Sequence, residues 1–181
     1  MIYYLSYDVF KSDGYCLMEK KQLDVYPYFG KAGAIPVVRE DARYSLEVIE
    51  RLADHLNSEG SHLWIFPQGE ITPNTKLPFH FYSGIGDVTS RLHRPALINC
   101  YFDFRFEEGQ YPAANVEFFG LREEVSLQRS GRKNFANELA VEFSRKSEEI
   151  ERETANGGMR DHKIILAGRK SVSDRAFTKL F

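Results

Sequence analysis

The chain has 181 residues, 43% of them hydrophobic and 28% charged, which is enough for one domain with an apolar core and short for two. Its formal net charge of −2 gives no basic field, so the composition argues against nucleic-acid binding. The two cysteines, Cys16 and Cys100, have no C-x-x-C spacing and fit a reducing, cytoplasmic compartment. No apolar run approaches the ~20 residues that a membrane-spanning helix requires.

Strand-like and helix-like segments alternate along the first half of the chain. Short apolar or aromatic runs predict strands at 15–18, 34–38, 63–66, 96–102 and 116–119. Apolar residues at helical spacing predict a helix from Ala42, with Asp41 placed to cap its start and Gly60 placed to end it. This alternation favours parallel neighbouring strands joined by helical crossovers. The predicted fold is α/β, with a mainly parallel sheet flanked by helices.

Two further helices are expected in the second half. One begins near Gly84 and carries Ile85, Val88 and Leu92 on one face. Gly84 and Gly86 are too few glycines for a dinucleotide-binding fingerprint, so we interpret them as a helix-opening turn. A long surface helix is predicted over 133–154, followed by a basic tail, and together they form the C-terminal part of the chain at 131–181. Without a linker or repeat, the chain is predicted to be one domain over 1–181.

The stretch "LWIFPQGEITPN" (63–74) places polar groups directly after an apolar strand. Pro67 ends the strand, and Gly69 permits either close approach of a ligand or an unusual backbone angle. Gln68 and Glu70 add an amide and a carboxylate. In parallel sheets, ligands bind beyond the carboxyl ends of the strands, so this is a candidate site. The alternative interpretation is an ordinary turn with a solvated polar pair.

These residues resemble the third motif of the glycerolipid acyltransferases, F-P-E-G-T-R-S. Further resemblances follow in the family's order: "MEKKQLDVYPYFG" is similar to the segment before the second motif, and "GAIPVVRE" to that motif, G-x-x-F-I-x-R, with Gly33 and Arg39 in its places. "FHFYSGIG" is similar to F-K-x-G, and "RPALINCYF" to the fourth motif, P-x-x-P-V. The resemblance covers about residues 15–119. Several motifs that follow one another in the family's order argue against a chance agreement.

The resemblance implies a glycerol-3-phosphate acyltransferase-like fold and a defined reaction. Such proteins transfer a fatty acyl group from acyl-CoA or acyl carrier protein to a hydroxyl of a lysophospholipid or related lipid. We therefore expect no cofactor beyond this co-substrate, a lipid acceptor and an acyl thioester as partners, no nucleic acid, and a position at the inner, cytoplasmic face of a membrane.

The resemblance also assigns substrate-binding roles. Arg39 is expected to clamp an anion, since a guanidinium binds phosphate through two parallel hydrogen bonds. Lys20 and Lys21 either face the same anion or are solvated. We expect the Gly69 amide and the Gln68 side chain to donate hydrogen bonds to the tetrahedral oxyanion. A carboxylate only accepts hydrogen bonds, so Glu70 is expected to bind the acceptor hydroxyl.

The chain departs from the family in the catalytic motif, H-x-x-x-x-D. None of its five histidines has Asp or Glu five positions later, so no catalytic residue is assigned. "MIYYLSYDVF" resembles the helix that follows this motif. Two interpretations remain: a fragment or wrongly assigned start whose upstream sequence holds the dyad, or a catalytically dead member acting as a lipid- or acyl-binding module. In the third motif, Gln68 replaces Glu and Ile71 replaces the basic residue, which weakens the case for a phosphate on the acceptor.

The remaining candidate residues have structural rather than functional explanations, or both. His55 and Glu59 lack a third ligand, so no metal site is expected. A set of aromatic residues suits either a membrane-facing or acyl-binding surface or, for most members, core packing: Tyr3, Tyr4, Tyr7, Tyr26, Tyr28, Phe29, Phe79, Phe81 and Tyr82.

Overall fold

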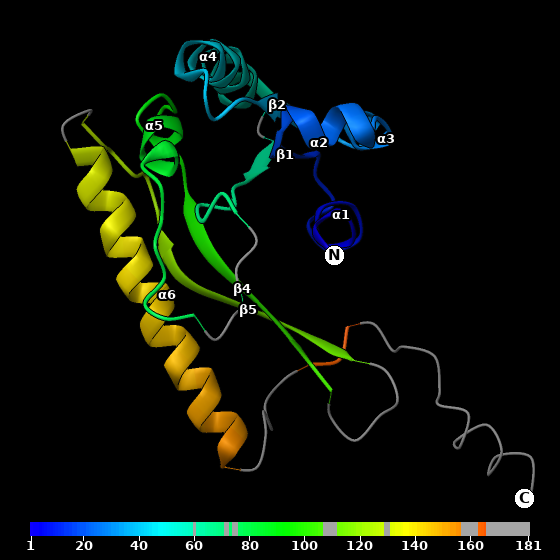
Figure 1. Cartoon of the computed structure of the whole chain (residues 1–181), viewed down its shortest axis with the longest axis vertical. Helices are drawn as coiled ribbons and strands as arrows, with labels where there is room; N and C mark the ends of the chain where they lie inside the picture. The colour runs from blue at the N-terminus through cyan, green and yellow to red at the C-terminus, as the bar shows by residue number, and fades with distance from the viewer. Residues whose placement is uncertain are drawn as a thin grey trace, which may run out of the picture.

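The computed structural model of the chain describes residues 1–59, 61–70, 73, 76–106, 112–128, 131–156 and 163–165. A parallel sheet is formed by β1 (Gly14–Glu19), β2 (Ala34–Val37) and β3 (His62–Trp64), in the order β2-β1-β3 (Figure 1). Pro36 lies in β2, an edge strand, where the missing backbone N–H is tolerated. The sheet confirms the predicted α/β fold and its parallel pairing.

Helices connect and flank these strands. The chain begins with α1 (Ile2–Tyr4), which continues as the π-helix η1 (Leu5–Phe10), and this confirms the helix expected there. The short helices α2 (Lys20–Val25) and α3 (Tyr28–Lys31) join β1 to β2, and α4 (Ala42–Glu59) joins β2 to β3. Asp41 caps α4 as predicted, because its Oδ1 accepts a hydrogen bond of 2.9 Å from the Tyr44 amide. Gly60 lies outside the described residues.

The last two strands, β4 (Leu97–Arg105) and β5 (Ala113–Arg122), pair with each other in an antiparallel hairpin. The order of elements had predicted a parallel neighbour for 96–102, and that pairing is wrong. The burial of β4 explains the difference, because Asn99, Tyr101 and Asp103 are buried while Ile98 and Phe104 are exposed. Such alternation is typical of a sheet with one covered face, whereas central parallel strands are covered on both.

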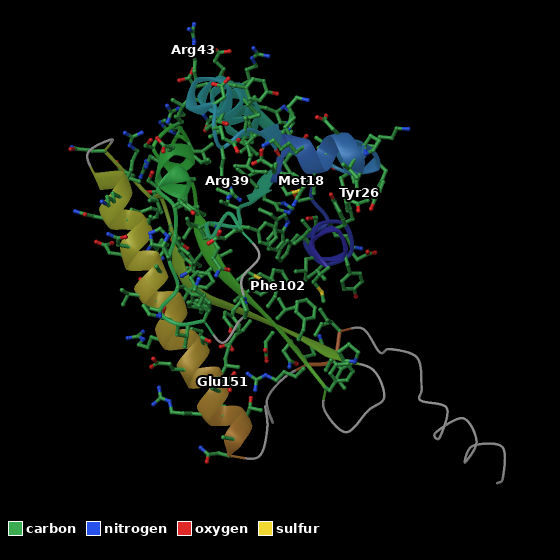
Figure 2. The ribbon with its side chains drawn as sticks, in the orientation of Figure 1. Met18, Tyr26, Arg39, Arg43, Phe102 and Glu151 are labelled. Atoms are coloured by element: carbon green, nitrogen blue, oxygen red, sulfur yellow. The ribbon has the colours of Figure 1, made fainter. Side chains whose placement is uncertain are left out.

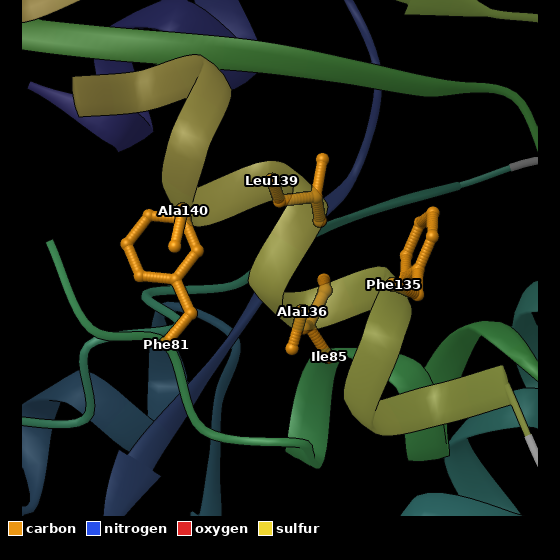
Figure 3. Close-up of a cluster of buried hydrophobic side chains, with 6 residues drawn as sticks. All are labelled: Phe81, Ile85, Phe135, Ala136, Leu139 and Ala140. Carbon is orange, nitrogen blue, oxygen red and sulfur yellow. The ribbon is translucent and has the colours of Figure 1, made fainter. Parts of the chain in front are cut away.

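Helix α6 (Arg132–Ala155) covers one face of this hairpin and confirms the long helix predicted at 133–154 (Figure 1). Its apolar side forms the core with α5 (Gly84–Thr89) and the segment before it; the cluster comprises Phe81, Ile85, Phe135, Ala136, Leu139 and Ala140 (Figure 3). Ile85 and Val88 are buried in α5 as expected. Leu92 lies beyond the helix, which is shorter than predicted.

The contact between α6 and the hairpin includes buried polar pairs beside the Phe119–Phe143 ring contact. Asn99 donates to Glu142 at 3.1 Å, and the hydroxyls of Tyr101 and Ser147 lie 3.0 Å apart. Both hydroxyls are buried, and burial raises the pKa of Tyr101. Helix α6 and the hairpin therefore meet through matched hydrogen-bonding groups. Removing one member of such a pair leaves the other buried without a partner.

Within the described ranges, no helix is both long and apolar enough to cross a membrane. The expected basic tail lies almost entirely outside the described residues, and the single-domain division over 1–181 stays a prediction.

Candidate functional site at the carboxyl edge of the parallel sheet

The candidate residues follow the carboxyl ends of the three parallel strands. Lys20 comes directly after β1, Arg39 two residues after β2, and the Pro67–Glu70 turn shortly after β3. Because the strands are parallel, their carboxyl ends meet at one edge of the sheet, as the motif order had indicated.

The backbone at Arg39 is fixed by the first turns of α4. The Ser45 hydroxyl accepts a hydrogen bond of 2.9 Å from the Val38 amide and donates one of 2.7 Å to the Val38 carbonyl. This double contact joins the end of β2 to the helix. Arg39 is therefore held on an ordered backbone while its side chain is exposed.

The Phe66–Gly69 segment is a hydrogen-bonded β-turn. The Gly69 amide donates to the Phe66 carbonyl at 3.0 Å, and Pro67 occupies the position after Phe66 that favours proline. Gly69 has a φ of +64°, a left-handed conformation that glycine adopts without strain. In this structure the Gly69 N–H is engaged within the turn, and its oxyanion role stays a prediction.

The turn brings together Arg39 and Gly69 with Tyr82, a residue that the motifs did not single out. An ideal Cβ on Gly69 would lie 3.1 Å from Tyr82 Cδ2 and 3.9 Å from Arg39 Nη2. The Tyr82 amide donates to the Pro67 carbonyl at 2.9 Å, which ties the 79–83 segment to the turn. The absent side chain of Gly69 thus leaves room for the tyrosine ring beside the guanidinium; Figure 2 shows the position of Arg39 within the fold.

No periodicity or charge pattern distinguishes Tyr82 from its aromatic neighbours. Its ring is 46% exposed, in contrast to the buried Phe81. The core interpretation is thus correct for Phe81 and wrong for Tyr82. The sequence signals were its place in "FHFYSGIG", the segment that resembles the family's F-K-x-G, and its place in the aromatic set that suits an acyl-binding surface.

The two lysines lie at the same edge and pair with carboxylates. Lys20 Nζ lies 3.0 Å from Asp24, and this pairing raises the pKa of Lys20. Lys21 Nζ lies 3.4 Å from Glu40, whose pKa is lowered by a backbone hydrogen bond and by Lys21. Arg39 makes no ion pair or hydrogen bond with the residues that the structure describes. Of the three cations, Arg39 is the one that makes no such pair with a described residue.

The polar residues of the turn differ in exposure. Gln68 is half-buried, whereas Glu70 is exposed and hydrogen-bonds to none of the described residues. Ile71, which stands in the place of the family's basic residue, lies outside the described residues.

His62 and His55 lie away from the candidate site. His62 lies at the opposite edge of the sheet, with Nε2 2.8 Å from the Ser6 hydroxyl and Nδ1 3.3 Å from the Ser12 hydroxyl. Burial lowers the pKa of His62, against a smaller opposing effect of Asp13. His55 Nε2 contacts the Tyr15 hydroxyl at 2.8 Å.

Among the histidines that the structure describes, His80 approaches the site. It is exposed and packs edge-on against the Tyr82 ring, with centroids 5.3 Å apart. In the part of the chain that the structure describes, no group of three or more His, Cys, Asp or Glu side chains is arranged to hold a metal ion.

The sheet and its edge define an α/β protein with a candidate ligand site where the β2–α4 and β3–α5 connections meet. A family model described as Acyltransferase matches residues 2–101, more than half of the chain, and includes Arg39, the Pro67–Glu70 turn and Tyr82. The chain therefore belongs to the acyltransferase family. No curated protein and no solved structure matches it.

Proposed function

We propose that the chain transfers a fatty acyl group from acyl-CoA or acyl carrier protein to a hydroxyl of a lysophospholipid or related lipid acceptor. In this reaction the acceptor oxygen attacks the thioester carbonyl and passes through a tetrahedral oxyanion. The carbon–sulfur bond then breaks, the ester forms, and the thiol leaves with the proton from the acceptor hydroxyl. Family membership supports the transfer, and the site geometry supports the choice of acceptor.

The observation that carries the acceptor assignment is the exposed Arg39 guanidinium beside Gly69, which pairs with none of the described residues. An exposed arginine on a fixed backbone is suited to an anionic group, because its planar fork loses little freedom when it binds two oxygens. The Tyr82 ring and the carboxylate of Glu70 border the same turn. In this proposal Arg39 holds the head group, and Glu70 accepts a hydrogen bond from an acceptor hydroxyl.

Proton removal from that hydroxyl requires a general base. The resemblance assigns this role to the histidine of H-x-x-x-x-D, which the 181 residues do not contain. The second candidate function is a lipid- or acyl-binding module that uses the same edge without transfer.

Transfer and binding assays on the same preparation separate the two functions. Radiolabelled palmitoyl-CoA or palmitoyl acyl carrier protein is incubated with lysophosphatidic acid, and the diacyl product is measured by thin-layer chromatography. Acceptor binding is measured in parallel by equilibrium dialysis. Product formation supports the enzyme, binding without product supports the binding module, and the absence of both overturns the two proposals together.

Arg39→Ala tests the residue on which the assignment depends. Loss of a charge-assisted contact is expected to weaken acceptor binding by about 1.5–3 kcal/mol, or roughly 10- to 150-fold. Arg43→Ala is the matched control, since Arg43 is an exposed arginine on α4 whose partner is Glu47, and Figure 2 shows it at the periphery. Equal affinities of Arg39→Ala and Arg43→Ala for lysophosphatidic acid would overturn the assignment.

We also propose that the protein works at the inner, cytoplasmic face of a membrane, where its acceptor resides. A lipid acceptor with a long acyl chain partitions into the bilayer, so a protein without direct access to that surface would meet little of it.

A further inference from the structure

The connection between β1 and β2 carries exposed apolar side chains at its far end. Neither α2 nor α3 has a buried residue. Val25, Tyr26 and Tyr28 are 67%, 51% and 59% exposed, and we call these three residues the aromatic tip. The core interpretation is wrong for both tyrosines. Three exposed side chains with large apolar surfaces thus lie within four positions, unlike singly scattered surface residues.

The rings of the tip form an organised group. Tyr26 and Tyr28 have centroids 6.2 Å apart, and Phe29 lies 4.2 Å from Tyr28 and 6.4 Å from Tyr26. Phe29 is half-buried and anchors the two exposed rings. Because tyrosine combines an apolar ring with a polar hydroxyl, such a group suits the boundary between water and hydrocarbon.

The surroundings of the tip are basic. From Lys20 to Lys31 the sequence holds three lysines and one aspartate, a net charge of +2 in a chain whose overall charge is −2. All three lysines are exposed. The carboxylates that face them, Asp24 and Glu40, are largely solvated, so these ion pairs are weak and are easily exchanged for other anions.

The tip and the candidate site share one side of the sheet. The Lys21–Glu40 ion pair joins α2 to the residue that follows Arg39. Figure 2 shows Tyr26 at the α2–α3 end of the fold, on the side away from α6. A surface bound by the tip would therefore lie near the carboxyl edge, where the acceptor is expected.

We propose that the aromatic tip inserts into the head-group region of a membrane that contains anionic phospholipid. Val25, Tyr26 and Tyr28 enter the interface, while Lys20, Lys21 and Lys31 contact the lipid phosphates. The inference rests on the proposed function in one respect, because it names the surface from which the acceptor reaches Arg39. Charge complementarity selects anionic lipid, and the interfacial character of the rings selects a lipid surface.

Another exposed apolar pair provides a matched control. Leu121 and Val141 are 59% and 69% exposed and line a groove of about 550 Å³ between β5 and α6. Their neighbours in the groove include Glu142 and Glu149 together with Arg122, Arg145 and Lys146. These mixed charges do not favour an anionic surface. Val25 and Val141 thus have the same chemistry and nearly the same exposure, but two of the cations near Val141 already pair with carboxylates, Arg122 with Glu142 and Lys146 with Glu117.

The test measures binding of the whole chain to lipid vesicles, without any transfer reaction. Vesicles of phosphatidylcholine alone and of phosphatidylcholine with phosphatidylglycerol are sedimented with the chain, with Val25→Ser/Tyr26→Ser and with Leu121→Ser/Val141→Ser. We expect binding to the anionic vesicles, a loss of about tenfold or more in the tip variant and no change in the control. Lys31→Gln is expected to weaken binding about fivefold, and added salt to weaken it further. All substituted residues are exposed, so the variants are expected to fold, and circular dichroism verifies that they do.

Several results would overturn the proposal. They are no binding to anionic vesicles, equal binding to neutral vesicles, or equal losses in the tip and control variants. Self-association through the tip, seen in sedimentation equilibrium as a dimer that only the tip variant abolishes, would assign the patch to a second copy of the chain instead. The Arg39 assays test the proposed function separately, so either proposal can fail while the other stands.

Discussion

Gly84 and Gly86 lie two positions apart in α5, and the structure predicts opposite effects for alanine at these positions. An ideal Cβ on Gly86 would lie 2.7 Å from the Arg132 carbonyl oxygen and 2.8 Å from its Cα, closer than real Cβ atoms approach backbone. Around Gly84 no atom lies within 4 Å of the corresponding position. Gly86 is therefore packed directly against the backbone at the start of α6, whereas Gly84 faces open space.

The magnitudes follow from two competing effects. Alanine restricts the unfolded chain and favours a helix, which stabilises by about 0.4–1 kcal/mol where the added methyl group fits. At Gly86 the methyl group forces α5 away from α6, and such overpacking costs about 1–3 kcal/mol. We expect Gly84→Ala to raise the free energy of unfolding slightly and Gly86→Ala to lower it by roughly 0.5–2 kcal/mol.

Urea unfolding followed by far-UV circular dichroism measures both variants against the parent chain. Equal slopes with denaturant verify that the comparison reports stability rather than a change in the unfolded state. If Gly86→Ala proves as stable as Gly84→Ala, the helices do not approach at this glycine, and the argument from the missing side chain is refuted.

Two further predictions concern the turn and the opposite edge of the sheet. Gly69→Ala should lower the free energy of unfolding by about 1–2 kcal/mol, because a left-handed residue acquires a Cβ that presses on Tyr82. The control Glu70→Gln should leave this free energy unchanged. Urea midpoints measure both variants, and equal midpoints would contradict the reasoning. Since burial lowers the pKa of His62 below its ordinary 6.5, the unfolded chain binds the proton more readily, so stability should be greatest above pH 6.5 and fall as the pH drops toward the folded-state pKa. His62→Gln should flatten this fall, and identical losses of melting temperature between pH 7.5 and 5.5 in both proteins would exclude His62 as its source.

Local patterns predicted the elements of the fold better than their pairing. All five apolar runs are strands, because side-chain hydrophobicity is a property of the run itself. The hydrogen-bonding partner of β4 depends instead on which face is covered, and the buried Asn99 and Asp103 became meaningful only beside α6. Leu92 was assigned to α5 by spacing alone, although the helix ends at Thr89.

The same distinction applies to the candidate site. Parallel strand order was sufficient to predict that the residue after β2 and the turn after β3 share one edge, and Arg39 does lie beside Gly69. The position of Tyr82 depends on a backbone hydrogen bond to Pro67 and on space above a glycine, neither of which any local pattern encodes. The engaged amide of Gly69 could not be predicted for the same reason, since a turn and an oxyanion site use similar residues.

The single tryptophan of the chain occupies the seam between the two sheets. Trp64 Nε1 donates to the Ser6 hydroxyl at 2.9 Å, and its ring lies 6.1 Å from that of Phe10 and 6.3 Å from that of Phe102. One indole therefore contacts the N-terminal helical segment, the parallel sheet and the hairpin at once. Tryptophan fluorescence therefore reports whether the two sheets are in contact. Separation of the hairpin from the parallel sheet would shift the tryptophan emission while leaving the helical signal in circular dichroism intact.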